Sequence, residues 1–110
     1  MKVAFHPSIR KVCEDEKEAA RKLGPENANL LKRRLEDLIA APTLEYMRNI
    51  RQGRCHELTA DRDGQLAVDL KQPKRLIFEV ADEPVPRLGN GGLDWKNVRS
   101  IRIIEITDYH

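Results

Sequence analysis

The sequence predicts an α+β fold: an N-terminal strand, then an antiparallel helix hairpin packed on one face of an antiparallel β-sheet. Apolar residues recur at helical spacing over residues 8–23 and 25–40. They alternate with the period of a strand over residues 65–70, 75–81 and 98–107. The length of 110 residues suits one domain with one core, expected to span 1–110.

The first half of the chain supplies the helix hairpin. Residues 2–5 have the pattern of a short strand. Ser8 is expected to cap a single helix that runs to Leu23. Gly24-Pro25 then ends that helix and begins the next, because Gly suits a C-terminal cap and Pro suits a first helical turn. The second helix is expected to run from Pro25 to about Ala40.

The second half supplies the sheet. One or two helical turns are expected over residues 43–50, and a strand is expected to begin at residues 55–58. Asp61-Arg62-Asp63-Gly64 predicts the turn of a hairpin, because Asp-Gly tolerates positive φ. Residues 82–98 hold two prolines, three glycines and the single Trp, which predicts a long loop insertion before the last strand.

Composition and charge narrow the function classes. Hydrophobic residues make up 40% and charged residues 35% of the chain, as in a globular protein. A formal net charge of +2 is too small to hold nucleic acid by bulk electrostatics, so RNA binding would need a local patch or a larger partner. With no signal-peptide pattern and no membrane-spanning run, a cytoplasmic protein is expected.

Chemistry-bearing side chains stand at the ends of the predicted strands. His56 begins one strand, Arg75 begins another, and Asp108, Tyr109 and His110 follow the last. Strand ends cluster in an antiparallel sheet, so these residues form one acid-base group if the last strand runs beside the strand of Arg75. Taken singly, each has a plainer explanation as a packed or solvated side chain, and Asp108 as the partner of a nearby arginine.

The sequence gives little indication of a metal or cofactor. The three histidines and two cysteines lack the spacing of metal ligands. Cys55 and His56 are neighbours on a predicted strand and therefore point to opposite faces. A metal site and a cofactor are not expected.

Four motifs together resemble the HigB branch of the RelE/ParE toxin superfamily. They are Arg34-Leu35-Glu36-Asp37-Leu38, the hairpin from His56 to Gly64, Arg75-Leu76-Ile77-Phe78, and the terminal Asp108-Tyr109-His110. The resemblance covers nearly the whole chain except residues 82–98. It implies the toxin of a type II toxin–antitoxin system, an endoribonuclease that cuts mRNA on the ribosome and so inhibits translation. It also implies a HigA-type helix-turn-helix antitoxin, with DNA bound only through the complex of the two proteins.

Carried over residue by residue, the resemblance assigns roles to the candidate site. His56 and His110 would be the acid-base pair, and Arg75 would contact the scissile phosphate. Asp108 would orient a histidine or tune its pKa, and Tyr109 would stack on a base or hold the substrate. The residues expected to bind RNA are Lys71, Lys74 and Arg62.

Two alternatives stay open at this point. One is a ParE-like toxin that poisons DNA gyrase on the same fold, and the other is a non-catalytic homologue that only binds an antitoxin. The second is favoured by Thr59-Ala60, which stands where relatives often carry Lys-Gly. Which histidine is base and which is acid, the codon preference and the stoichiometry of the complex are not determined by the sequence.

Overall fold

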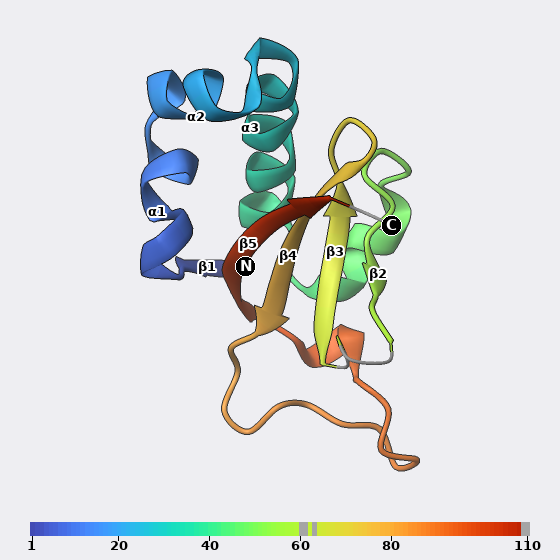
Figure 1. Cartoon of the computed structure of the whole chain (residues 1–110). Helices are drawn as coiled ribbons and strands as arrows, with labels where there is room; N and C mark the ends of the chain where they lie inside the picture. The colour runs from blue at the N-terminus through green and yellow to red at the C-terminus, as the bar shows by residue number, and fades with distance from the viewer. Residues whose placement is uncertain (60–61, 63, 109–110) are drawn as a thin grey trace.

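A computed structural model describes residues 1–59, 62 and 64–108 (Figure 1). Its helices lie together on one side of a sheet, and the long connection after the fourth strand extends away from it (Figure 1). In chain order the elements are β1 (Lys2–Phe5), α1 (Pro7–Glu14), α2 (Glu16–Leu23), α3 (Pro25–Ala40), η1 (Leu44–Asn49), β2 (His56–Glu57), β3 (Gln65–Asp69), β4 (Lys74–Val80), η3 (Trp95–Asn97) and β5 (Ser100–Asp108).

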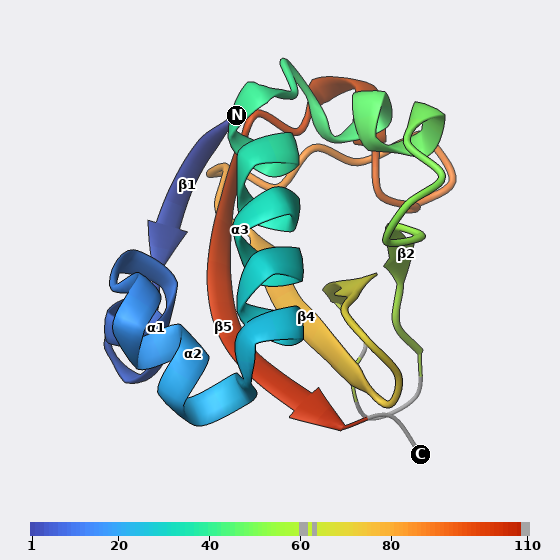
Figure 2. The same ribbon diagram turned by 90° about the horizontal axis from the view of Figure 1, so that it is seen from above.

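The described strands form one sheet in the order β1-β5-β4-β3-β2. The neighbours from β2 to β5 are antiparallel, which confirms the predicted meander. The first strand differs, because β1 runs parallel to β5 with Lys2 opposite Ser100. The whole chain between these two strands serves as the crossover that a parallel pair requires. As a result β5 lies inside the sheet order, with β1 beside its residues 100–103 and β4 along its other side (Figure 2).

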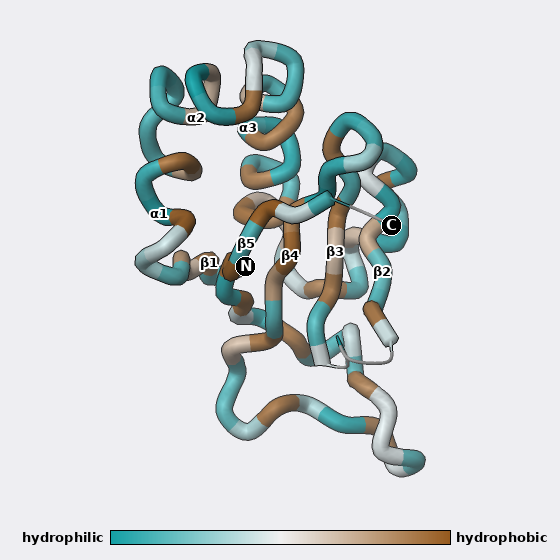
Figure 3. The backbone as a smooth tube through the Cα atoms, viewed as in Figure 1, coloured by the Kyte–Doolittle hydropathy of each residue, from teal (hydrophilic) through white to brown (hydrophobic). Residues whose placement is uncertain are grey.

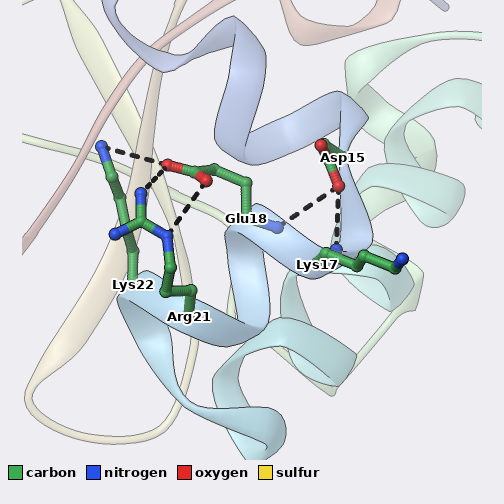
Figure 4. A network of polar contacts seen from close by, with 5 residues as sticks. All are labelled: Asp15, Lys17, Glu18, Arg21 and Lys22. Atoms are coloured by element: carbon green, nitrogen blue, oxygen red, sulfur yellow. Dashed lines mark hydrogen bonds and ion pairs between the residues drawn. The ribbon is translucent and has the colours of Figure 1, made fainter.

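The predicted helix over residues 8–23 is broken at Asp15, and this part of the prediction was wrong. Asp15 adopts an extended backbone, and its N–H still donates to the carbonyl of Lys11 at 3.0 Å. Its carboxylate accepts hydrogen bonds from the N–H groups of Lys17 and Glu18 at 2.9 and 3.3 Å (Figure 4). One short side chain therefore caps the start of α2, an option that competes with continued helix.

The cap of α1 also differs from the prediction. His6, rather than Ser8, occupies the N-cap position, and its Nδ1 accepts from the N–H of Ser8 at 3.1 Å. Ser8 lies two residues too late to cap the helix, because Pro7 already occupies the first helical position. The second predicted helix agrees with α3, which follows Gly24 at φ +83°.

The core lies between α3 and one face of the sheet. Alternate strand residues such as Leu66, Leu76 and Phe78 pack there against Leu31 and Leu38 of α3. In the backbone coloured by hydropathy, apolar colour runs through the middle of β3 and β4 (Figure 3). Within the described residues, no helix is both long and apolar enough to cross a membrane.

An irregularity in β5 keeps its apolar residues on the core side. Ile77 pairs with Glu105 but the next residue, Phe78, pairs with Ile103, so Ile104 is an extra residue. The bulge allows both Ile103 and Ile106 to contact the core, although they are three positions apart and would point to opposite faces of a regular strand. Glu105 consequently lies on the opposite face of the sheet, in the same row as Ile77.

The connection over residues 82–98, which the sequence predicted as a long loop, is attached to the core by its aromatic residue. Trp95 is buried, and its Nε1 donates to Oε2 of Glu57 at 3.0 Å. The guanidinium of Arg48 lies 4.0 Å from the centre of the Trp95 ring. At the other end of the loop, Asp82 accepts hydrogen bonds from the N–H groups of Arg99 and Ser100. Trp95 therefore serves to fix this segment.

Candidate functional site

The sheet face turned away from the helices holds the candidates His56 and Arg75, and we call it the helix-free face. One row across four strands contains His56, Ala67, Ile77 and Glu105. Ala67 and Ile77 are buried but do not belong to the core cluster under the helices, so this face is separate from the core.

A second row of the helix-free face contains Arg75 between Asp69 and Thr107. The predicted condition is met, because β5 runs directly beside the strand of Arg75. Arg75 is only 8% exposed, which is unusual for an arginine. His56 lies two strands away and two residues along the register, so the two Cα atoms are about 12 Å apart from standard sheet spacings.

The geometry around His56 determines the tautomer of its neutral ring. Nδ1 of His56 lies 2.6 Å from the backbone carbonyl oxygen of Arg54. A carbonyl oxygen only accepts, so Nδ1 must carry the hydrogen. In the neutral ring Nε2 then has a free lone pair, which is the state that a general base requires.

Two residues that the sequence analysis missed complete this part of the site. Nε of Arg54 donates to Oδ2 of Asp69 at 2.8 Å, and Asp69 stands directly opposite Arg75 in the sheet. Arg54 is a left-handed residue with φ +41°, and it follows Gly53 at φ +87°. The only hint in the sequence is the Gly53-Arg54 dipeptide just before the strand of His56, because glycine commonly supplies positive φ.

The buried Arg34 of α3 supports the same corner from the core side. Its Nε donates to the backbone carbonyl of Asp69 at 2.9 Å. Gly53 packs so closely on this side chain that an added Cβ would lie 2.6 Å from Nε of Arg34. The N–H of Asp69 donates to the carbonyl of Gly53 at 2.6 Å, so Arg34, Gly53 and Asp69 form one fixed support under Arg54.

The three cations expected to bind RNA each pair with a carboxylate of the chain. Nη2 of Arg62 lies 2.7 Å from Oε1 of Glu105, so the Arg62 side chain crosses the helix-free face. The other two pairs are Lys71–Glu26 at 2.7 Å and Lys74–Asp108 at 2.9 Å. All three pairs are substantially exposed, and such pairs contribute about 0 to 1 kcal/mol and exchange readily with other ions.

The structure places the terminal motif only in part. Asp108 stands opposite Lys74, one residue along β4 from Arg75 and so on the alternate face of the sheet. Its carboxylate accepts a hydrogen bond from Lys74 rather than lying beside Arg75 in the row of the helix-free face. Tyr109 and His110 lie outside the described residues, so their assigned roles stay predictions.

Neither cysteine belongs to the helix-free face. Burial raises the pKa of the Cys55 thiol to about 12, so the thiol is protonated at neutral pH. Burial and the nearby carboxylate of Glu14 raise the pKa of Cys13 to about 12 as well. Cys13 lines a mainly apolar hollow of about 570 Å³ between α1, α2 and α3, remote from the helix-free face. In the part of the chain that the structure describes, no three His, Cys, Asp or Glu residues gather as a metal site.

Comparison with known proteins bears on the fold. No protein-family model and no curated protein sequence matches the chain. Among solved structures, the chain is similar to a YoeB/ParE toxin from Agrobacterium tumefaciens, with a TM-score of 0.53 and 15% sequence identity over 100% of both chains. The chain therefore has the α+β fold of the RelE/ParE-like toxins, as its sequence predicted. At 15% identity the similarity establishes the fold alone.

Proposed function

We propose that this chain is the toxin of a type II toxin–antitoxin pair and acts as a metal-independent endoribonuclease on mRNA in the ribosome. The observation that carries the proposal is the orientation of His56. Its Nδ1 is held by the Arg54 carbonyl at 2.6 Å, and its Nε2 is left to accept a proton on the sheet face that also contains Arg75. The fold shared with the Agrobacterium tumefaciens toxin supports the same class of protein.

The proposed reaction uses the 2′-hydroxyl of the RNA itself. His56 takes the proton of that hydroxyl through Nε2, and the resulting oxygen attacks the adjacent phosphorus. The attack forms a 2′,3′-cyclic phosphate as the bond to the 5′-oxygen breaks. Arg75 stabilises the added negative charge on the phosphate oxygens by paired hydrogen bonds. This assignment makes His56 the base.

A general acid must protonate the leaving 5′-oxygen. We assign this role to His110, with Asp108 orienting the ring and Tyr109 holding a base of the RNA. His110 follows Asp108 by two residues, so the acid would approach from the end of β5. In the sheet order, β4 and β3 lie between β5 and the strand of His56. Lys71, Lys74 and Arg62 would exchange their carboxylate partners for phosphates as the RNA binds.

The proposal also names partners and place. A HigA-type helix-turn-helix antitoxin would hold the toxin inactive and provide any contact with DNA. The ribosome would present the mRNA, which compensates for a net charge of only +2. Action on ribosomes places the protein in the cytoplasm.

A binding-only homologue is the second candidate, and one observation favours it. Lys71, Lys74 and Arg62 are each neutralised by a carboxylate of the same chain, at 2.7, 2.9 and 2.7 Å. Such a protein would bind its antitoxin tightly and leave growth and mRNA unaffected. A gyrase poison on the same fold would instead leave mRNA intact and break DNA.

Induced expression separates these candidates. Primer extension on total mRNA is expected to show new 5′ ends within minutes of induction of the wild-type chain, with no accompanying DNA breaks. His56→Ala should abolish the new ends. Arg21→Ala, which removes an exposed cation of α2, serves as the control and should retain cleavage. DNA breaks with intact mRNA would overturn the proposal in favour of gyrase poisoning.

A further inference from the structure

Arg54 is held in a backbone conformation that non-glycine residues do not favour. A non-glycine residue at φ +41° is in the left-handed region, where Cβ crowds the backbone. Such strain persists only where the surroundings impose it, and it concentrates at functional sites. Here the surroundings are Gly53, Asp69 and the buried Arg34, which hydrogen-bond or contact one another as described above.

The imposed conformation directs the guanidinium of Arg54 toward solvent. Asp69 binds only Nε, at 2.8 Å, and thereby fixes the plane of the group. The side chain of Arg54 is 71% exposed, and its two terminal nitrogens bind no other described residue. An arginine held by Nε presents the paired Nη donors that match two oxygens of a phosphate.

The local charge favours an anion at this corner. Two arginines, Arg34 and Arg54, donate hydrogen bonds to Asp69, and a third, Arg75, stands opposite it in the sheet. Arg34 donates from Nε to a backbone carbonyl rather than to a carboxylate, so its charge is not neutralised there.

The position of Arg54 relative to His56 defines which anion it binds. The carbonyl of Arg54 holds Nδ1 of His56, so one residue places both the guanidinium and the base. An RNA strand that presents its 2′-hydroxyl to His56 continues past Arg54 or Arg75, because these two arginines stand on the two sides of Asp69. Arg75 is buried and suits the scissile phosphate, whereas the exposed Arg54 suits a neighbouring phosphate.

We propose that Arg54 is a second phosphate-binding residue of the site, which holds the backbone phosphate next to the scissile one through its two terminal nitrogens. The inference rests on the proposed ribonuclease function. Phosphate contacts set register and affinity without reading bases. Arg54 therefore positions the strand over His56, and it contributes binding that is already present before the reaction.

The test is a binding measurement on ribosomes programmed with an mRNA whose 2′-hydroxyls in the target codon are methylated, so that it binds without being cut. Arg54→Gln should raise Kd about tenfold and reduce the slope of log Kd against log salt by about 0.7, the loss of one single-strand phosphate contact. Arg54→Lys should recover part of the affinity, because lysine keeps the positive charge. It should not recover all of it, because lysine lacks the paired Nη donors.

The matched control is Arg51→Gln, which removes an exposed arginine three residues earlier in the same connection. It should leave both Kd and the salt slope unchanged, and thermal melting verifies that every variant is folded. With unmethylated mRNA, Arg54→Gln should raise KM about tenfold and leave kcat within about threefold, as for a contact present in the ground state.

The outcomes separate this inference from the function on which it rests. A wild-type chain that does not cut unmethylated mRNA overturns both. A wild-type chain that cuts, together with an Arg54→Gln variant of unchanged Kd and salt slope, overturns only the role of Arg54. An equal loss of affinity in Arg51→Gln would also overturn it, because removing any positive charge from this connection would then weaken RNA binding to the same extent.

Discussion

Gly53→Ala tests whether the support beneath the site is as closely packed as the structure shows. The added Cβ would lie 2.6 Å from Nε and 2.8 Å from Cδ of Arg34, distances that real contacts do not reach. The residue would also have to hold φ +87° with a side chain, at about 1 to 2 kcal/mol. Displacing Arg34 breaks its hydrogen bond to the Asp69 carbonyl, a further loss of about 1.5 to 3 kcal/mol for a charged donor.

Together these terms predict that Gly53→Ala lowers the free energy of unfolding by about 3 kcal/mol. Urea denaturation monitored by circular dichroism measures this, provided that the m-value is unchanged. Gly91→Ala is the matched control, because Gly91 has φ +90° with no atom within 4 Å of an added Cβ. The control should show the backbone cost alone.

A double-mutant cycle with Arg34→Ala isolates the steric overlap between the added Cβ at position 53 and the Arg34 side chain. On the Arg34→Ala background, Gly53→Ala should cost only its backbone strain, so the two changes should couple by about 1.5 to 3 kcal/mol. Strict additivity, or a Gly53→Ala cost no larger than that of Gly91→Ala, would refute the close packing of Gly53 on Arg34. It would also remove the physical reason given for the conformation of Arg54.

Three further predictions concern the cap of α2, the two thiols and the backbone of Arg54. Asp15→Ala should lower the free energy of unfolding by about 1 kcal/mol in thermal melts, because it removes the cap of α2, and an unchanged melting temperature would contradict that role. The pKa values of Cys13 and Cys55 near 12 exceed the ordinary value of 9.0, so stability should be intact below pH 9 and fall between pH 9 and 12. A Cys13→Ala, Cys55→Ala double variant should lose less stability over that range in urea titrations, and identical pH profiles would count against the burial of the thiols. Arg54→Gly should be more stable than Arg54→Ala by about 1 kcal/mol, because both lose the pair with Asp69 but only glycine relieves φ +41°, and an equal stability would argue against the strain.

The parts of the fold that followed from sequence are those governed by local periodicity. The 25–40 helix and the strands of Leu66, Leu76 and Ile101 were predicted because each shows its apolar spacing within a few residues. The break at Asp15 was missed because a capping side chain and a helix interior have similar sequence patterns. The parallel pairing of β1 with β5 depends on contacts about 100 residues apart, which no local pattern records.

The candidate site divides in the same way. His56 and Arg75 were identified by residue type and by their places at strand starts, and the register puts them on one face. Arg54 and Asp69 were not identified, because an exposed arginine and a strand aspartate have no distinguishing pattern. Arg54 and Asp69 are 15 residues apart in sequence, and a left-handed turn at Gly53 and Arg54 brings them together. The packing of Gly53 on Arg34 accounts for that turn, and it is visible only in the folded chain.

The most direct test of the central claim is the single-turnover rate of mRNA cleavage on ribosomes by His56→Ala. If Nε2 of His56 is the base, the rate should fall at least about 100-fold relative to the wild type, while the melting temperature and antitoxin binding stay unchanged. The wild-type product should end in a 2′,3′-cyclic phosphate. A folded His56→Ala variant that cleaves within about threefold of the wild-type rate would contradict the account.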